Sequence, residues 1–310
     1  MRIYTDLDAF GEVVHPVVTM GTFDGLHIGH QKIINDLIKT AKEEKGETVV
    51  ITFDPHPRIV LQLDNKNLKF INTQEEKIEL LHKFGIDHLI IIPFTEEFSK
   101  MSSTEFIQKI LVHKIKTRTL IIGYDHHFGN KRKGNYKHLN ELGELYRFRV
   151  KEIPAQLIDE IAVSSTKIRD SLIEGNVRKA NSYLDYPFSI FGKVTAGSQI
   201  GKTIGFPTAN ISMENPYKLV PNKGVYAVKA LLRGQYFNGM LNIGVRPTLH
   251  KDQQETIELH IFNFTDEIYE EFITVYFYDR LRDEQKFESL ELLKHQLAKD
   301  QKDAKKILSS

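Results

Sequence analysis

Two hydrophobic patterns divide this chain and constrain its fold. From Val17 to about Tyr183, short apolar runs alternate with amphipathic stretches. The predicted strands are Val17–Thr19, Thr48–Phe53, His88–Pro93, Thr119–Ile122 and Phe148–Ile153, and the predicted helices are His30–Glu44, Gln74–Phe84, Ser103–His113, Lys137–Tyr146 and Thr166–Leu172. Strands that alternate with helices form a parallel sheet covered on both faces. The pattern therefore predicts a doubly wound α/β domain, whose ligands bind at the carboxyl ends of the strands.

After Pro187 the chain becomes rich in short strands. Gly, Pro and Asn separate the expected strands Ser189–Thr195, Gly224–Leu232, Tyr236–Ile243, Thr256–Phe262 and Ile273–Tyr278. Short strands with turn signals between them predict a closed β-barrel or a sandwich, and an amphipathic helix near Leu290–Lys299 would cover one side. A length of 310 residues favours two domains. We place their boundary in Leu184–Pro187, which predicts domains 1–186 and 187–310.

The composition narrows the class of protein. Lys+Arg 42 against Asp+Glu 41 gives a net charge of +1, so no electrostatic footprint for nucleic acid or an anionic membrane is present. The absence of cysteine excludes disulfides and thiolate zinc sites. Acids near the N-terminus stand where a signal peptide needs apolar residues, and the longest apolar run, around Leu89–Phe94, is too short to span a bilayer. We expect a cytoplasmic protein with small-molecule partners; the oligomeric state stays open.

The segment Thr19–His30 has the most specific pattern in the first half. It follows the first predicted strand and opens the first helix. Gly21 and Gly25 allow a tight turn and a close approach of backbone to a ligand. The helix start offers free N–H groups and a positive dipole end, which favour phosphate. His27 and His30, three residues apart, share one face, where they can donate hydrogen bonds as charge builds on a leaving pyrophosphate. The candidate ATP-binding residues are Gly21, Thr22, Phe23, Asp24 and Gly25.

The histidine pair has two weaker interpretations. A zinc site would need a third ligand, and an i,i+3 pair alone is weak evidence for one. A purely structural role is the other alternative. The full pattern, Thr-Met-Gly-Thr-Phe-Asp-Gly-Leu-His-Ile-Gly-His, is long and specific. It resembles the nucleotidyltransferase superfamily that also contains the class I aminoacyl-tRNA synthetases, and this resemblance implies adenylyl transfer.

A second candidate phosphate-binding segment spans Val163–Arg169. Its hydroxyls precede a predicted helix, and Arg169 adds a fixed positive charge. Alone, such a run is usually a helix cap; beside the histidine motif it resembles the second phosphate-binding signature of flavin adenylyltransferases. Lys100–Ser103 resembles the lysine signature of tRNA synthetases. We reject that alternative because a helix starts there and the chain has no basic, tRNA-sized extension. The residues carried over for ATP are Ser164, Ser165 and Thr166.

The second half contains the motif Gly201–Asn210. A P-loop must run straight into a helix, and here Gly205 and Pro207 forbid one. The motif resembles instead the Gly-x-x-x-Gly-Phe-Pro-Thr-Ala-Asn signature of riboflavin kinases. Thr208 and Asn210 offer hard oxygen ligands for Mg²⁺ that bridges ATP phosphates; the alternative is an ordinary polar turn. The candidate ATP-binding residues here are Gly201, Lys202, Gly205 and Pro207.

The remaining motifs extend the resemblance over nearly the whole chain. Gly224–Tyr226, Asn242–Thr248 and Ile257–His260 follow in the family order, and the sequence resembles the bacterial bifunctional riboflavin kinase/FAD synthetases. In that family the glutamate matched by Glu258 is the base that takes the proton from the riboflavin 5′-hydroxyl, as kinase chemistry requires. Catalytic roles are implied for Glu258, His27, His30 and Arg169. Flavin-binding roles are implied for Asp54, His56, Asp125, Phe128, Arg246 and Arg282.

The chain departs from the family pattern at two places. His126-His127 stands where an aromatic-basic pair is common, and Ile268-Tyr269-Glu270 replaces Leu-Tyr-Gly, so one loop loses a turn glycine. The resemblance implies two consecutive reactions with ATP and Mg²⁺: phosphorylation of riboflavin to FMN, then adenylylation of FMN to FAD with release of pyrophosphate. Two alternatives stay open, a single-function enzyme with one degenerate site and a non-enzymatic flavin-binding protein.

Overall fold

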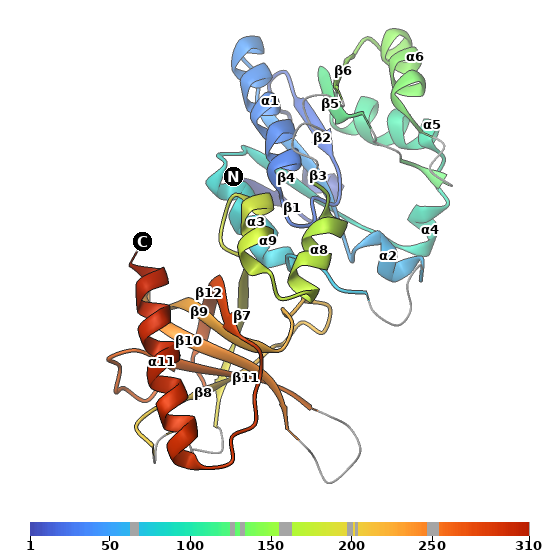
Figure 1. Ribbon diagram of the computed structural model, residues 1–310. Helices are drawn as coiled ribbons and strands as arrows, with labels where there is room; N and C mark the ends of the chain where they lie inside the picture. Colours follow the sequence, from blue (N-terminus) through green and yellow to red (C-terminus); the bar gives the residue numbers. More distant parts are fainter. Residues whose placement is uncertain are drawn as a thin grey trace. The chain divides into compact units, whose positions relative to one another are not determined.

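The chain folds into two compact units, each described here by itself. The computed structural model describes residues 1–62, 68–124, 128–130, 134–154, 163–196, 201, 204–246 and 254–309. The compact units are Met1–Ser164 and Ser165–Ser310 (Figure 1). This division precedes the predicted domain boundary at 186/187, because helices α8 (Ser165–Ile173) and α9 (Val177–Leu184) pack with the second unit. The boundary itself stays a prediction.

A six-stranded parallel sheet forms the centre of the first unit. Its strands are β1 (Arg2–Tyr4), β2 (Val17–Met20), β3 (Thr48–Asp54), β4 (His88–Pro93), β5 (Thr119–Gly123) and β6 (Arg149–Ile153). They lie in the order β1-β4-β3-β2-β5-β6, and every pair is parallel. The predicted doubly wound sheet is confirmed, with β1 as an additional edge strand too short to show a periodic pattern. The strand order reverses between β2 and β5, which makes their carboxyl ends the expected ligand position.

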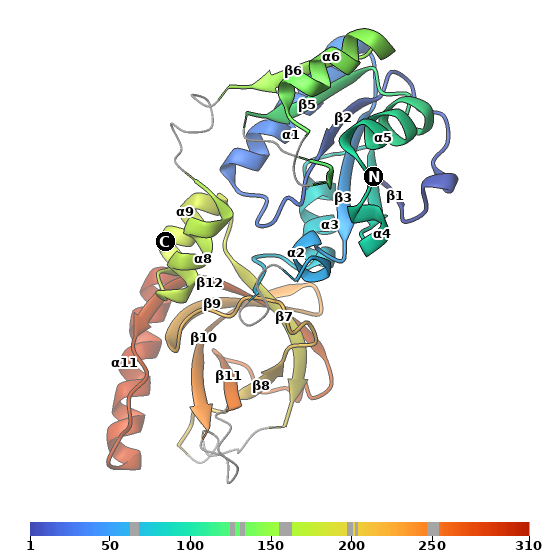
Figure 2. The same cartoon turned by 90° about the vertical axis from the view of Figure 1, so that its right-hand side faces the viewer.

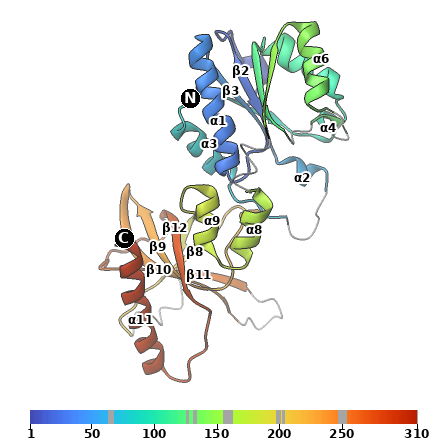
Figure 3. The same cartoon turned by 45° about the horizontal axis from the view of Figure 1, so that its top comes forward.

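Helices cover both faces of this sheet (Figure 3). Helices α1 (Ile28–Glu44) and α3 (Gln74–Lys83) pack on one face, over Val17, Val50 and Leu89. The other face carries α5 (Ser103–Phe106), the π-helical segment η2 (Ile107–Lys114) that continues it, and α6 (Tyr136–Tyr146). Three single-turn elements, η1 (Leu7–Ala9), α2 (Pro57–Val60) and α4 (Glu96–Ser99), complete the described part of this unit. Apart from the carboxyl ends of β3 and β4, the residues of β2–β5 are buried on both faces, as is usual for parallel strands.

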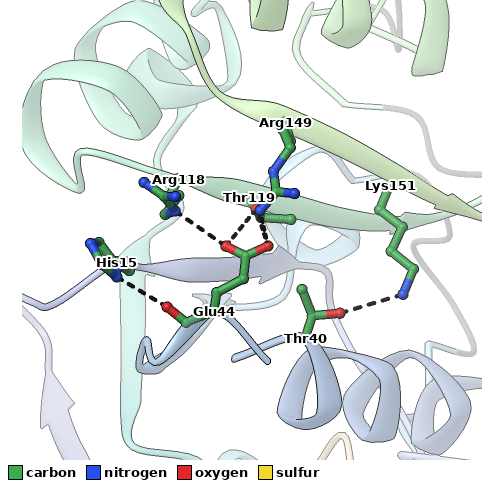
Figure 4. Close-up of polar contacts among 7 residues, drawn as sticks. All are labelled: His15, Thr40, Glu44, Arg118, Thr119, Arg149 and Lys151. Carbon is green, nitrogen blue, oxygen red and sulfur yellow. Dashed lines mark hydrogen bonds and ion pairs between the residues drawn. The ribbon is translucent and has the colours of Figure 1, made fainter. Parts of the chain in front are cut away.

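A cluster around Glu44 fixes the end of α1 that is remote from the candidate ligand position (Figure 4). The Glu44 carboxylate accepts hydrogen bonds from the Thr119 hydroxyl at 2.9 and 3.0 Å and from the Arg149 guanidinium. Arg118 approaches the same carboxylate to 3.5 Å. Thr119 and Arg149 are the first residues of β5 and β6. Since α1 is anchored at the amino ends of these strands, its first turn is held at their carboxyl ends.

The second unit contains a closed antiparallel barrel (Figure 2). Its strands are β7 (Ser189–Thr195), β8 (Ala209–Ser212), β9 (Gly224–Leu232), β10 (Gln235–Arg246), β11 (Gln254–Ile261) and β12 (Phe272–Arg282). Their order is β10-β11-β8-β7-β12-β9, and β9 closes the barrel on β10. The five predicted strands are present. The sixth strand, β8, lies within the Gly201–Asn210 motif and beyond, where glycine and proline conceal its short pattern.

Three helices pack on the barrel. The terminal helix α11 (Leu290–Leu308) runs farther than predicted and buries Ala304 and Leu308 against Ala227 and Met240. The helices α8 and α9 form a pair beside β12. The Asn181 amide joins them to the barrel, because it donates to the Phe277 carbonyl and accepts from the Phe188 N–H, both at 2.8 Å. Within the described ranges, no helix is long and apolar enough to cross a membrane.

Candidate active sites

The loop Gly21–His27 places the first candidate site at the strand-order reversal. The Gly21 N–H donates to the Ile51 carbonyl at 3.0 Å, so the loop leaves β2 alongside β3. Phe23, Gly25 and Leu26 adopt φ values of 49°, 86° and 35°. Two of these three are not glycine, and such left-handed backbone is costly for other residues. This strained turn brings the chain directly into the first turn of α1.

His27 and His30 stack at the start of α1. Their ring centroids are 3.8 Å apart with an interplanar angle of 16°, and Phe23 packs edge-on against His30. His27 caps the helix, since its Nδ1 accepts from the His30 N–H at 3.4 Å. Desolvation lowers the pKa of His30 well below its usual range, and the charges of His27 and Lys77 lower it further. His30 is therefore neutral at pH 7. The free N–H groups of the first turn of α1 lie at the same helix start.

Asp24, a candidate ATP-binding residue, has a structural task in this arrangement. Its side chain is buried, and Oδ1 accepts from the N–H groups of Ile71 at 2.9 Å and Asn72 at 3.3 Å. These bonds tie the segment before α3 to the loop after β2. Asp24, which belongs to the predicted ATP motif, therefore helps to hold the backbone of the site in place.

Lys77 is a residue of this region that the motifs did not indicate. It lies on α3, is 5% exposed, and donates to Thr52 Oγ1 at 3.4 Å and Gln74 Oε1 at 3.1 Å. Desolvation lowers its pKa to about 8, although Asp24 and Asp54 act in the opposite direction. The only signal in the sequence was a lysine on the apolar face of a helix, beside Leu81 one turn later.

The second phosphate-binding signature lies at the start of α8. Ser164 and Thr166 are exposed, Ser165 begins the helix, and Arg169 is partly exposed one turn later. The next residue inward, Ile168, is buried. The signature thus begins at the last residue of the first unit and continues into the first turns of α8 in the second, with its side chains exposed or partly exposed.

The candidate flavin residues of the first unit lie in different surroundings. Asp54 is exposed at the carboxyl end of β3, and His56 caps α2, accepting from the Arg58 N–H at 3.1 Å. The His56 ring packs on Phe70 with centroids 4.4 Å apart. Phe128 packs against Phe106 at 5.8 Å. Asp125 and the neighbouring His126-His127 lie outside the described residues.

Strand register assembles the second candidate site. Asn210 of β8 lies directly opposite Glu258 of β11, and Glu258 lies directly opposite Asn242 of β10. Directly paired residues on neighbouring strands bring their Cβ atoms to within about 5 Å. The predicted base and one predicted metal ligand, which are 48 positions apart in the numbering, are therefore neighbours on one face of the barrel.

The loop before β8 folds back on itself beside this face. The Phe206 N–H donates to the Gly201 carbonyl at 2.8 Å, and a Cβ on Gly201 would lie 2.2 Å from the Phe206 carbonyl oxygen. Gly205 has a φ of 87°. His260 donates from Nδ1 to the Pro207 carbonyl, at 2.7 Å. His260, which sequence reasoning did not single out, thus pins the loop; Thr208 is partly exposed, and Lys202 lies outside the described residues.

Arg282 makes a network with the terminal helix. Its Nε donates to both carboxylate oxygens of Asp300 at 3.1 and 2.9 Å, and Nη2 lies 2.8 Å from Asp300 Oδ2. Nη1 donates to the Asp283 carbonyl at 3.0 Å. Much of the guanidinium is therefore committed to α11, and flavin contact at Arg282 stays a prediction. Arg246 is the last residue of β10, and flavin contact at its side chain stays a prediction.

Comparisons with known proteins identify the family of the chain. A family model described as FAD synthetase matches residues 12–167, and one described as riboflavin kinase matches residues 184–308. A bifunctional riboflavin kinase/FMN adenylyltransferase of Buchnera aphidicola is 42% identical over 91% of each chain. That of Bacillus subtilis is 37% identical over 96% of this chain and 94% of its own. The chain therefore belongs to the family of bifunctional riboflavin kinase/FMN adenylyltransferases.

A solved structure of similar fold carries a different description. The crystal structure described as a macrolide-efflux protein from Streptococcus pneumoniae matches with a TM-score of 0.88 and 29% identity, covering 98% of both chains. The same fold thus recurs in another bacterial chain. The efflux description concerns that protein.

Proposed function

We propose that this riboflavin kinase and FMN adenylyltransferase carries out its two reactions at separate sites, the kinase on the barrel and the adenylyl transfer at the sheet. The observation that carries the proposal is the register that sets Asn210 opposite Glu258. It joins a candidate metal ligand and a candidate base in the unit that lacks the histidine motif. Each unit therefore has its own chemical groups.

The kinase site supplies a base and a set of oxygen donors. Glu258 would accept the proton of the riboflavin 5′-hydroxyl as that oxygen attacks the γ-phosphorus of ATP and ADP leaves. The Thr208 hydroxyl and the Asn210 carbonyl oxygen are hard donors that fit Mg²⁺. When bound, Mg²⁺ would neutralise charge on the β- and γ-phosphates. The Gly201–Pro207 loop would cover the nucleotide, held by the His260 contact to Pro207.

Adenylyl transfer to FMN needs no general base, because the nucleophilic phosphate is already ionised. An FMN phosphate oxygen would attack the α-phosphorus of ATP, and the bond to pyrophosphate would break. His27, His30 and the first N–H groups of α1 would stabilise the charge that moves to the leaving group. We assign Ser164, Ser165, Thr166 and Arg169 to the triphosphate.

The proposal also covers the residues that bind flavin and the location of the enzyme. Asp54, His56, Asp125 and Phe128 would bind FMN at the sheet, while Arg246 and Arg282 would bind riboflavin at the barrel. Both reactions consume ATP, a cytoplasmic metabolite, which supports a cytoplasmic enzyme.

Separate assays of the two half-reactions test the division. Asn210→Ala or Glu258→Ala should lower FMN formation from riboflavin at least about 100-fold, because a lost base or phosphate ligand has effects of this size. Both variants should still convert FMN to FAD. His27→Ala combined with His30→Ala should show the reverse pattern. The division fails if a folded variant loses both reactions together.

A further inference from the structure

Lys77 carries a buried ammonium for which the described residues provide no ion pair. Lysine is almost never fully buried unless it is paired, yet Lys77 is 5% exposed. Its Nζ donates to two neutral oxygens, Thr52 Oγ1 at 3.4 Å and Gln74 Oε1 at 3.1 Å. Among the described residues, no carboxylate forms an ion pair with it. Desolvation outweighs the favourable charges of Asp24 and Asp54, since it lowers the pKa of Lys77 to about 8. The buried ammonium therefore costs free energy, so stability does not explain this lysine.

The ammonium lies where three segments of the adenylyl-transfer site meet. Thr52 and Asp54 belong to the carboxyl end of β3, Asp24 to the loop after β2, and His30 to the first turn of α1. Lys77 interacts electrostatically with Asp24, Asp54 and His30. It therefore faces the end of the sheet from the side that α1 and α3 cover.

His30 does not supply positive charge to this site at neutral pH. Burial, the stacked His27 ring and Lys77 hold the pKa of His30 well below 6.5. The buried Nδ1 of His30 has no hydrogen-bond partner in the part of the chain that the structure describes. Among the described residues, an ammonium without an ion pair and a ring nitrogen without a hydrogen-bond partner thus belong to the same region. A polyanionic ligand would interact favourably with both.

We propose that Lys77 provides a buried positive charge at the adenylyl-transfer site and acts on the phosphates of the bound nucleotide across the His27–His30 pair. It is a positioning residue, since its own contacts are to Thr52 and Gln74. Charge grows on the leaving pyrophosphate, and a preorganised ammonium in a region of low dielectric stabilises that charge more than water does. The inference rests on the assignment of adenylyl transfer to this site.

The pH dependence of this role differs in sign from that of stability. Desolvation lowers the pKa of Lys77 to about 8, while Asp24 and Asp54 raise it. Since the role needs the ammonium, kcat/KM for adenylyl transfer should fall as the pH rises through about 8. The unfolded chain keeps this proton up to about 10.5, the ordinary pKa of lysine, while the folded state releases it at about 8. The free energy of unfolding therefore rises with pH between these values, as the cost of the buried ammonium is lost. A loss of activity caused by deprotonation of Lys77 at alkaline pH is therefore not a result of unfolding.

The test uses the full chain and both half-reactions. Lys77→Met should lower kcat/KM for FMN adenylylation about 100-fold, the size of effect seen for one preorganised electrostatic group. It should abolish the alkaline decline near pH 8, leave riboflavin phosphorylation unchanged, and keep or raise the thermal midpoint. Lys77→Arg should restore part of the rate without a decline near pH 8. Lys83→Met is the matched control, because Lys83 is exposed on the same helix.

Three outcomes overturn the inference. The first is a Lys77→Met enzyme with the rate and pH profile of the unaltered chain. The second is a loss of both reactions with a lowered thermal midpoint, which would give Lys77 a structural role. If Lys77→Met does not fold, the neutral Lys77→Gln, which can keep the bond to Thr52, decides by the same criteria. The third is a pH profile unchanged in Lys77→Gln. Adenylylation that survives His27→Ala with His30→Ala would instead refute the site assignment.

Discussion

Glu270 shows how a single residue departs from the family pattern without changing the local backbone. It stands where the family often has glycine, and its φ of 68° is the left-handed conformation that glycine adopts freely. Its N–H donates to the Val194 carbonyl at 2.9 Å, and its carboxylate lies 2.5 Å from the Lys193 ammonium. Glu270 thus holds the left-handed turn conformation that glycine adopts freely, at the cost of backbone strain.

A reversal to glycine at this position should stabilise the barrel unit. Glu270→Gly relieves left-handed strain of about 1 kcal/mol and gives up only an exposed ion pair, which contributes little. We expect the free energy of unfolding to rise by about 0.5 kcal/mol or more, measured by urea denaturation. Glu267→Gly, an exposed neighbour without a left-handed φ, should not stabilise. A lower stability of Glu270→Gly would contradict the strain argument.

At the scale of elements, the orientation of α1 decides whether the histidine motif forms a site. The helix must start at the carboxyl ends of the strands and finish at their amino ends. Its apolar stripe, Ile34, Leu37 and Ala41, holds it on the sheet. The Glu44 cluster fixes its register along the strands.

Because of the Glu44 cluster, we expect alanine substitutions of the adjacent residues Glu43 and Glu44 to differ strongly in their effect on the free energy of unfolding. Glu44→Ala removes a carboxylate with a side chain 10% exposed, together with its bonds to Thr119 and Arg149. We expect a loss of about 1–3 kcal/mol in the free energy of unfolding of the first unit. Glu43→Ala, whose side chain is 61% exposed, should change it by less than about 0.5 kcal/mol. Equal losses in denaturant titrations would show that the cluster does not anchor α1.

At the scale of the whole molecule, the helix that carries the second phosphate-binding signature is built into the unit of the kinase barrel. Ser165 begins this unit, and α8 continues through Gly175 into α9, which rests on β12. The Asn222 N–H also donates to the Leu172 carbonyl at 3.0 Å. If Ser165 and Arg169 bind ATP for adenylyl transfer, that reaction depends on packing in the other unit.

This dependence predicts an effect at a distance from either set of reacting groups. Asn181→Ala removes the two hydrogen bonds of this amide, to Phe277 of β12 and to Phe188, the residue before β7. FMN adenylylation should fall several-fold while riboflavin phosphorylation changes less, because α8 loses its support and the Asn210–Glu258 register does not. Ser182→Ala, on the exposed side of the same helix, is the control. A larger effect on phosphorylation than on adenylylation would contradict the prediction.

The sequence by itself determined the architecture, the family and the motifs. Periodicity separates a parallel sheet from a barrel because each repeats over many residues, and the motifs are local runs whose order is visible in one chain. Only the tertiary structure decided which distant side chains meet. It set Asn210 opposite Glu258 through strand register, committed Arg282 to Asp300, and buried Lys77 beside the histidine pair. Such contacts depend on packing between elements far apart in the chain, and no local pattern of residues encodes them.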